Sequence, residues 1–333
     1  MNLSAVLNLL ADGGFHSGAA LGEALGVSRT AIWKHLQKLD ELGLKLVSVK
    51  GKGYCLEGGL ELLASEKILA GMSGQSQTLV SLLDIHPVID STNAKAMAHA
   101  IAQNDPGYVC LAEQQTAGRG RRGRAWISPY GKNIYMSVLW GFDGGAAALE
   151  GLSLAVGVAI VRALESRGVS ELELKWPNDV LWRGRKLAGV LLEMTGDVAG
   201  YCQVVVGIGL NVSMPAEFGK DIDQEWVDVS SICELLEIDP VSRNDLIGGV
   251  LQELMPMLNS FQAKGFACYR DSWESLDAFK GQEVELHMGN NRVEGRAVGV
   301  SDTGALRIES EGVEAQFNGG EISLRGKRHD AKK

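Results

Sequence analysis

The pattern of hydrophobic and polar positions divides the chain into three segments. In the first, apolar residues recur every three or four positions in three successive stretches, which is typical of amphipathic helices, and two short alternating stretches follow. Gly26 breaks the chain between the second and third helices, and Ser28 is placed to cap the third. The predicted elements are helices over 1–11, 19–25 and 28–42 and strands over 45–49 and 54–56. This order predicts a winged helix-turn-helix, to which we assign residues 1–63.

The second segment mixes helices with strands. Continuous apolar runs predict buried strands, and helical spacing recurs between them. The predicted strands cover 108–112, 134–140, 172–176, 190–194 and 202–208, and the predicted helices cover 93–103 and 151–167. The neighbouring runs 187–194 and 202–212 resemble an antiparallel pair, so we expect a mixed sheet covered by helices, not a doubly wound parallel sheet. We assign this α/β domain residues 64–270.

Short alternating strands fill the third segment. They are predicted over 283–287, 292–300, 305–309, 313–317 and 322–324. Gly289-Asn-Asn291 and Asp302-Thr-Gly304 are turn sequences that separate some of them. The pattern predicts an SH3-like β-barrel over residues 271–325, followed by a polar tail, 326–333, that we expect to be mobile. The whole chain is therefore predicted to be an α+β multidomain protein.

The composition is that of a cytoplasmic globular protein. The chain is 45% hydrophobic and 22% charged, with a formal net charge of −9. Its longest apolar stretch, 152–164, is interrupted by polar residues and too short for a membrane span, and the N-terminus lacks a secretion pattern. The five cysteines are scattered without a Cys-x-x-Cys pair, so we expect reduced thiols instead of a zinc site or disulfides.

Four arginines and three glycines alternate within Gly118-Arg-Gly-Arg-Arg-Gly-Arg124. Glycines let backbone N–H groups approach a ligand closely, and guanidinium groups match phosphate and carboxylate oxygens. A chain of net negative charge that concentrates four guanidinium groups in this way is expected to bind a polyanion, and a nucleoside triphosphate is the first candidate.

The same run formally matches the G-x-G-x-x-G fingerprint of dinucleotide-binding folds. That fingerprint requires a helix to open at the glycines, whereas Ala125-Trp-Ile-Ser-Pro129 continues as a loop. We therefore expect a flexible cationic flap that orders over an anionic ligand. Ordering costs about 1–2 kcal/mol per residue, so several arginine contacts are needed to close the flap.

Polar residues elsewhere in the second segment are placed to meet the same ligand. Asp90-Ser-Thr-Asn93 starts a helix, where its side chains either cap the helix or face a small polar ligand, and Gln115 precedes the arginine run. Lys175-Trp-Pro-Asn-Asp179 follows a strand, and Lys186 begins the next. A lysine there is either an ordinary hairpin residue or a group that holds a carboxylate against a phosphate. Gly207-Ile-Gly-Leu-Asn211 suits close approach to a nucleotide.

The third predicted helix carries a polar stripe opposite its apolar stripe. Residues 1–56 hold six lysines and arginines against four acids, so this segment is +2 in a chain of −9. The stripe and the predicted wing are expected to contact DNA, unless the segment is an interaction module that never binds it. The candidate DNA-binding residues are Ser28, Arg29, Thr30, Trp33, Lys34, Gln37, Lys50 and Lys52.

Together these motifs resemble the biotin–protein ligase family in order and approximate spacing. The matching runs are Asp90-Ser-Thr-Asn93, Glu113 to Arg124, Lys175 to Asp179, Arg185-Lys-Leu-Ala-Gly189 and Gly207 to Val212. With a winged helix in front, the chain resembles the bifunctional type, which joins a class II synthetase-like ligase domain to a repressor of the biotin operon. The resemblance covers nearly the full length, to Ile322-Ser-Leu-Arg325.

The resemblance implies a two-step reaction. Biotin and ATP, with Mg²⁺, form biotinyl-5′-AMP, and biotin then passes to a lysine of the biotin carboxyl carrier protein of acetyl-CoA carboxylase. It implies Lys186, Arg119 and Arg121 as catalytic residues and Asp179 as a metal ligand. The implied biotin contacts are Ser91, Thr92, Asn93, Gln115, Arg119, Gly120, Arg121 and Lys186. The implied ATP and adenylate contacts are Arg119, Arg121, Trp126, Lys175, Asn178, Asn211 and Trp226.

The resemblance also implies partners: operator DNA, the carrier protein, and a second copy of the chain when the adenylate is bound, but no membrane. Three other hypotheses remain open. They are a monofunctional ligase with a non-repressing N-terminal module, a biotin-sensing repressor without catalysis, and a lipoate-type ligase of the same fold. The arginine run and Lys186 favour an adenylating enzyme, because a pure sensor needs no such groups.

Overall fold

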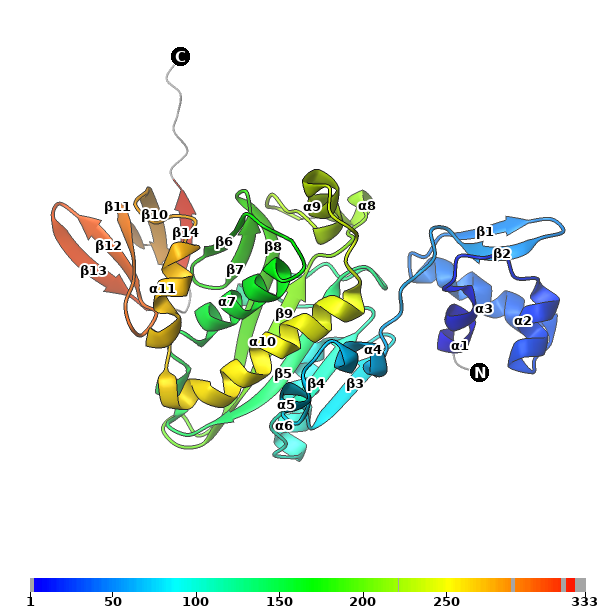
Figure 1. The fold of residues 1–333 in the computed structure, drawn as a ribbon, viewed down its shortest axis with the longest axis horizontal. Coiled ribbons are helices and arrows are strands. Elements are labelled where there is room, and N and C mark those ends of the chain that lie inside the picture. The colour runs from blue at the N-terminus through cyan, green and yellow to red at the C-terminus, as the bar shows by residue number, and fades with distance from the viewer. Residues whose placement is uncertain (1–2, 221, 289–290, 319–321, 327–333) are drawn as a thin grey trace, which may run out of the picture.

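Three parts follow one another along the molecule (Figure 1), with the winged helix at one end and a small β-sheet at the other. The computed structural model describes residues 3–220, 222–288, 291–318 and 322–326. The tail that we expected to be mobile lies, from residue 327 onward, outside the described residues.

The N-terminal part has the predicted order of elements. It comprises α1 (Leu3–Leu10), α2 (Gly18–Leu25), α3 (Arg29–Glu41), β1 (Leu46–Val49) and β2 (Gly53–Leu56). The side chain of Ser28 accepts a hydrogen bond from the N–H of Ala31 and so caps α3. Gly26 ends α2 in the left-handed conformation, with φ 66°. The apolar stripe of α3, Ile32, Leu36 and Leu39, is buried, which leaves the polar stripe facing outward.

A seven-stranded sheet forms the centre. Its order is β3 (Leu82–His86), β4 (Tyr108–Ala112), β5 (Ile134–Phe142), β9 (Cys202–Leu210), β8 (Arg185–Gly196), β7 (Asp179–Trp182) and β6 (Leu172–Lys175). β3 and β4 pair in parallel, and the other neighbours pair antiparallel. The predicted mixed sheet, including the antiparallel pairing of β8 with β9, is therefore confirmed.

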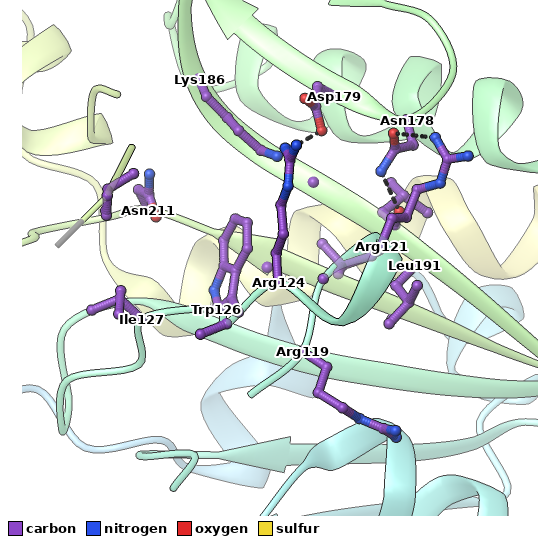
Figure 2. A pocket seen from close by; sticks show the side chains of 18 of the residues that line it. Arg119, Arg121, Arg124, Trp126, Ile127, Asn178, Asp179, Lys186, Leu191 and Asn211 are labelled. Carbon is purple, nitrogen blue, oxygen red and sulfur yellow. Dashed lines mark hydrogen bonds and ion pairs between the residues drawn. The ribbon is translucent and has the colours of Figure 1, made fainter. Parts of the chain in front are cut away.

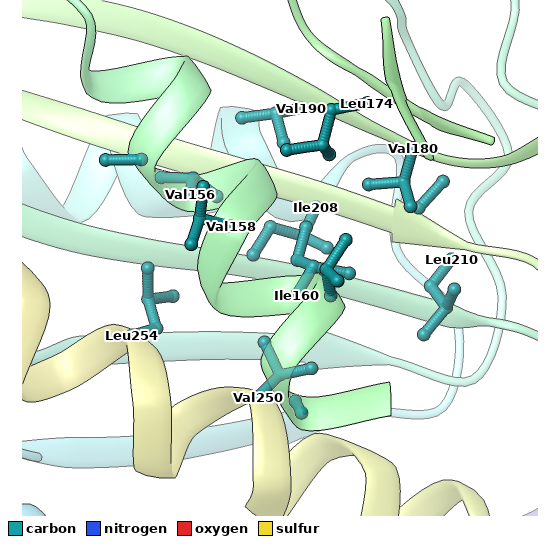
Figure 3. Packing of buried hydrophobic residues seen from close by; sticks show 14 of the residues in the cluster. Val156, Val158, Ile160, Leu174, Val180, Val190, Ile208, Leu210, Val250 and Leu254 are labelled. Carbon is teal, nitrogen blue, oxygen red and sulfur yellow. The ribbon is translucent and has the colours of Figure 1, made fainter. Parts of the chain in front are cut away.

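Helices cover both faces of this sheet. On one face, α7 (Leu152–Glu165) and α10 (Arg243–Lys264) pack through residues such as Ile160, Val250 and Leu254 (Figure 3). On the other face, α6 (Thr92–Ala102) buries Ala96 and Ala100 against β4 and β5. The shorter helices are α4 (Ser65–Ala70), α5 (Gly74–Gln77), α8 (Ala216–Gly219), α9 (Val229–Leu236) and α11 (Ala267–Ser275). α6 covers only part of its face, which leaves room for a cavity beside it.

Residues 145–165 are apolar and long enough, by length and composition alone, to be a candidate membrane span. The backbone divides them, however, because Gly151 has a φ of 72° between a short 3₁₀ turn and α7. Eleven of the 14 residues of α7 are buried inside the protein. This segment is therefore a core helix of the central domain.

The C-terminal part is an antiparallel sheet of five strands. The order is β13 (Val313–Phe317), β12 (Leu306–Ser310), β11 (Asn291–Val300), β10 (Glu283–Met288) and β14 (Ile322–Gly326). It joins the central sheet at β6, where Leu174 forms a parallel bridge with Asp277. The buried indole of Trp176 also donates a 3.0 Å hydrogen bond to the carbonyl of Gly304. The Lys175–Asp179 segment is thus held from the C-terminal side.

The carboxyl of Asp277 at this junction predicts a specific pH dependence. Burial raises its pKa to about 6, with Glu274 adding to the shift, and Oδ2 has no hydrogen-bond partner within the described ranges. Because the pKa is raised in the folded state, the folded form binds the extra proton, and this stabilisation is lost as the pH rises through about 6. Asp277→Asn is expected to raise the free energy of unfolding by about 1–2 kcal/mol near pH 8, and by less near pH 5. Urea unfolding at both pH values checks this; an equal difference at both would contradict it.

Candidate active site

A cavity of about 680 Å³ lies beside α6, on the sheet face opposite α7 and α10. Its floor is the stretch of β8 and β9 that carries Gly189, Gly207 and Gly209. Side chains alternate along a strand, so the intervening Val190 and Ile208 enter the core under α7. The glycines therefore leave room above the floor for the side chains of Asn93, Trp126 and Lys186. The floor is rigid because the backbones of the glycines pair on both sides in the sheet.

The start of α6 forms the polar end of the cavity. Ser91 caps the helix by accepting a hydrogen bond from the N–H of Ala94. Gln115 Oε1 accepts hydrogen bonds from both the N–H and the hydroxyl of Thr92, at 2.9 and 3.1 Å. Ser91 and Thr92 are buried and Gln115 is half-buried, and their polar groups can exchange partners with a small polar ligand. The two roles considered for this run, capping and ligand binding, are thus compatible.

Asn93 extends this network across the sheet. Its side chain lies 2.6 Å from the hydroxyl of Ser137 and donates to Glu193 Oε2 at 2.8 Å. Gly207 must be glycine here, because a Cβ at that position would lie 2.1 Å from Asn93 Oδ1. Asn93 lines the cavity, but its side chain is mainly occupied in holding α6 to β5 and β8.

The arginine run folds as a tight turn, not as a helix. The backbones of Arg119 and Ala125 form an isolated antiparallel β-bridge, and the N–H of Gly120 donates to the carbonyl of Arg124. Residues 121–123 between them form a single 3₁₀ turn. The helix that a dinucleotide fingerprint requires is therefore missing from this described segment. The turn stands over the cavity and places its arginine side chains around it (Figure 2).

The arginines point in different directions. Arg121 donates a 3.2 Å hydrogen bond to Asn178 Oδ1, and Arg124 extends toward Asp179 and Lys186 (Figure 2). Burial lowers the pKa of the Arg121 guanidinium, and the Asp179 carboxylate opposes that shift. Arg119 points the opposite way and lies 3.4 Å from Glu193. Arg121 and Arg124 thus face one end of the cavity, and Arg119 is held at its side.

Lys186 and Asp179 form an ion pair in the wall of the cavity. Lys186 Nζ lies 2.8 Å from Asp179 Oδ1, and about one sixth of each side chain is exposed, 17% and 15%. Asp179 Oδ1 makes no bond of regular hydrogen-bond geometry within the described part of the chain, so the contact is electrostatic. An anionic ligand can compete with the Asp179 carboxylate for this lysine, because both carry negative charge.

Trp126 lies directly over Gly209 and beside Gly189 in the glycine floor. A Cβ on Gly209 would come within 2.3 Å of its indole ring, and Lys186 Nζ lies 5.6 Å from the ring centroid. The indole N–H is buried and has no hydrogen-bond partner among the described residues. The ring therefore offers a flat apolar surface and one free donor to a ligand in the cavity.

The segment 222–229, which follows β9 in the chain, closes another side of the cavity. The carbonyl of Asn211 accepts the N–H of Val229, its side chain donates to the carbonyl of Val227, and Trp226 forms a parallel bridge with Lys186. The indole of Trp226 donates to the carbonyl of Gly219 at 3.3 Å. Asn211 thus anchors this segment, and Trp226 ties it to the strand that carries Lys186.

The structure brings every predicted ligand-binding residue to this one cavity. Sequence reasoning missed part of the lining, chiefly apolar side chains whose types are also those of any core. The lining residues that were predicted are Ser91, Thr92, Asn93, Gln115, Arg119, Gly120, Arg121, Trp126, Lys175, Asn178, Asp179, Lys186, Asn211 and Trp226. Those that were missed include Ile127, Met136, Leu191, Met214 and Ile222.

The predicted DNA-binding residues are all exposed, on α3 and its cap and at the turn between β1 and β2. Trp33 is 51% exposed, which is unusual for an indole with no apolar neighbours on its stripe. Lys50 and Lys52 are exposed at the turn between β1 and β2. The exposed positions of α3 and its cap are Ser28, Arg29, Thr30, Trp33, Lys34 and Gln37. Each predicted side chain can therefore reach a partner without local unfolding.

Comparisons with known proteins agree with this architecture. The sequence pattern described as an HTH domain matches residues 2–55, that of the biotin/lipoate A/B protein ligase family matches 85–211, and that of the biotin protein ligase C terminal domain matches 279–325. A solved biotin protein ligase from Aquifex aeolicus in complex with biotin and ATP is 30% identical, with a TM-score of 0.62 over 74% of this chain and 100% of that one. Fold and site therefore define a protein ligase of the biotin/lipoate class.

Full-length relatives place the chain more closely. It is 40% identical over 320 residues to the bifunctional ligase/repressor BirA of Escherichia coli, covering 96% of each chain. It is 31% identical to the protein of the same name from Bacillus subtilis, covering 91% of this chain and 92% of that one. The chain belongs to the family of bifunctional ligase/repressor BirA proteins, in which a biotin–protein ligase is joined to a DNA-binding repressor domain.

Proposed function

We propose that the cavity converts biotin and ATP to biotinyl-5′-AMP and pyrophosphate, and that the activated biotin is then transferred to a lysine of the biotin carboxyl carrier protein of acetyl-CoA carboxylase. The observation that carries this proposal is the layout of the cavity. A buried polar helix start lies at one end, Arg121, Asn178 and Lys186 lie at the other, and a glycine floor runs between them.

In this proposal each end of the cavity binds one part of the reactants. Thr92 and Gln115 exchange their mutual hydrogen bonds for the ureido group of biotin, while Ser91 and Asn93 keep the helix start in place. Lys186 leaves Asp179 to contact the biotin carboxylate and the α-phosphate. A carboxylate oxygen attacks phosphorus, pyrophosphate leaves, and the lysine stabilises the charge on the phosphoryl oxygens. The carrier amine later attacks the acyl carbon, and AMP leaves.

Loop closure protects the intermediate. An acyl-adenylate is readily hydrolysed, so a site that retains it must exclude water. In this proposal Arg119, Gly120 and Arg121 fold over the mixed anhydride, and Trp126 and Trp226 flank the adenine. Their position in the lining of the cavity supports these roles. Lys175 and Asn178, which also line the cavity, are proposed to contact the departing phosphates, and Asn211 holds the segment that carries Trp226.

Mg²⁺ is expected to arrive with ATP. No group of three His, Cys, Asp or Glu side chains able to hold a metal occurs in the described part of the chain. Mg²⁺ bound to nucleotides often takes only one or two carboxylates from the protein, and Asp179 fits that role because it becomes free when Lys186 moves to the ligand. The metal would neutralise charge on the phosphates.

A biotin-dependent pyrophosphate–ATP exchange assay tests the enzyme. Label exchange into ATP is expected with biotin and not with lipoate. Exchange with lipoate alone would assign the chain to lipoate activation, and no exchange with either compound would favour a sensor without catalysis. Because ATP, the carrier protein and the operator are cytoplasmic, we place the protein in the cytoplasm.

We further propose that biotinyl-5′-AMP acts as corepressor by favouring a homodimer that binds the biotin operator. One α3 offers few phosphate contacts, and two on a palindrome gain effective concentration. Ligand-stimulated binding to the promoter of the biotin-synthesis operon is expected in gel shifts at moderate salt. Absence of that stimulation would leave only the ligase activity.

A substitution on the exposed stripe sharpens this test. Lys34→Ala is expected to weaken binding to all DNA sequences and to lower the slope of log affinity against log salt by about 1, because one phosphate contact is lost. Lys67→Ala, on α4 outside the winged helix, is the matched control. Salt titrations of operator binding measure both slopes, and equal slopes for Lys34→Ala and the unmodified protein would remove Lys34 from the interface.

A further inference from the structure

The base of the arginine turn is fastened to the linker that follows the winged helix. Glu113 begins the matching run, two residues before Gln115, and is only 4% exposed. One of its carboxylate oxygens accepts the N–H of Leu63 at 2.6 Å, and the other pairs with Arg243 at 2.8 Å. Its carbonyl accepts the N–H of Gly131, which closes the loop 113–131 at its base.

The linker itself is bound to the start of α10. Glu61 accepts hydrogen bonds from the backbone N–H of Arg243 at 2.7 Å and from the side chain of Asn244 at 2.6 Å. Arg243 also donates to the carbonyls of Glu61 and Asn133. Burial raises the pKa of Glu61, but donors from Ser242 and Asn244 outweigh burial and hold that pKa below its ordinary value. The first turn of α10 is therefore a common anchor for the linker and for both ends of the loop.

The other end of the loop, at Tyr130, packs into the hydrophobic core of the winged helix. Tyr130 is 2% exposed and belongs to the same buried cluster as Leu10, Leu36 and Leu56. Gly131, with a φ of 66°, lies so close to Leu60 that an added Cβ would be 2.5 Å from Leu60 Cδ1. The arginine turn thus cannot shift at its base without changing the packing of the linker and the winged helix.

We propose that Glu113 and Arg243 are positioning residues that couple closure of the arginine turn to docking of the linker at residues 60–64. This rests on the proposed function, since the adenylate closes the turn. Neither residue lines the cavity, so they act through the loop. A buried ion pair is stable only while both charges keep each other and their hydrogen bonds. A movement of the loop that displaces Glu113 therefore weakens its contacts with both Arg243 and the linker. Thermodynamic reciprocity then requires that ligand binding tighten the linker, and that linker undocking weaken ligand binding. The orientation of the winged helix responds to the ligand within a single chain.

Hydrogen exchange with and without biotinyl-5′-AMP tests this coupling in the full-length protein. The amides to follow are those of Leu63 and Ala64, which donate to Glu113 and Asn244 and do not line the cavity. The ligand is expected to slow their exchange about tenfold, a change that a purely structural network would not show. In Glu61→Gln the amide N–H₂ cannot accept the hydrogen bonds that the carboxylate accepts from the start of α10. This ligand-dependent protection of the linker amides is therefore expected to disappear. KM for ATP is expected to rise severalfold, with kcat less affected.

Asp84→Asn is the matched control, since Asp84 is a half-buried carboxylate of the same domain that accepts from Tyr108 and pairs with His86. It is expected to keep both the protection and the KM. Protection of Thr92 and Trp126 without protection of Leu63 and Ala64 would overturn the coupling while leaving the ligase intact. No protection at Thr92 and Trp126 would instead count against ligand binding. If Glu61→Gln unfolds, the linker amides of the unmodified protein still decide the question.

Discussion

Replacing Lys186 with alanine is expected to slow biotin-dependent pyrophosphate exchange by about 10²–10³-fold, the usual cost of removing one group that stabilises developing charge in a water-excluded site. Lys186 is the lysine that the structure places in the cavity wall on the glycine-bearing strand, beside Trp126 and paired with Asp179. The loss should fall mainly on kcat, because the lysine acts where the carboxylate meets the phosphate.

A second lysine separates this effect from a general loss of stability. Lys280 pairs with Glu274 at the same N–O distance of 2.8 Å, but does not line the cavity. Lys280→Ala should leave exchange within about twofold of the unmodified rate, as surface ion pairs contribute little. Thermal melts of both variants serve as the folding control. An unchanged exchange rate in folded Lys186→Ala would remove this residue from the mechanism.

Gly209→Ala is expected to lower kcat/KM for ATP by about 10²-fold, because a shift of about 1 Å at a reacting site has that consequence. The added Cβ would lie 2.3 Å from the indole of Trp126. The backbone of Gly209 pairs with Tyr135 on one side and Gly189 on the other, so the strand cannot retreat. The indole must therefore move off the floor and into the space that the adenine is proposed to occupy.

Gly141→Ala is the matched control in the neighbouring strand β5. Its Cβ would lie 2.2 Å from the hydroxyl of Tyr201, a similar overlap. Tyr201 is 41% exposed, so the tip of its side chain can turn away. Steady-state kinetics at varied ATP should show near-normal kcat/KM for this variant. Equal losses in both glycine variants would point to sheet damage instead of displacement of Trp126.

Much of the fold was predictable because local signals agreed with the final structure. Ser28, Gly26 and the apolar stripe of α3 each specify the winged helix within a few residues. The long helix α10 was missed. It is apolar over much of its surface, carries Pro256 in its interior, and so lacks a clear amphipathic stripe. The short strand β7 was also missed, since it has only four residues after Pro177.

The candidate site divides in the same way. Its polar residues could be found from the sequence because they occur in compact runs. In the arginine turn, for example, the repulsion between like charges is unfavourable unless an anionic ligand is bound. The apolar lining could not, because Met136 and Leu191 resemble any other strand residues. The pairing of Glu113 with Arg243 joins positions 130 residues apart, and no local pattern announces it. Such contacts are set by the packing of α10 on the linker.

The central claim is that the arginine turn and Lys186 clamp an activated biotin, and a crystal structure with a non-hydrolysable analogue of biotinyl-5′-AMP tests it most directly. We predict Arg119 released from Glu193, Arg121 and the backbone of Gly120 folded over the phosphoryl linkage, and Lys186 Nζ on its oxygens in place of Asp179. An analogue bound in the cavity with Arg119 still on Glu193 and Lys186 still on Asp179 would contradict the account.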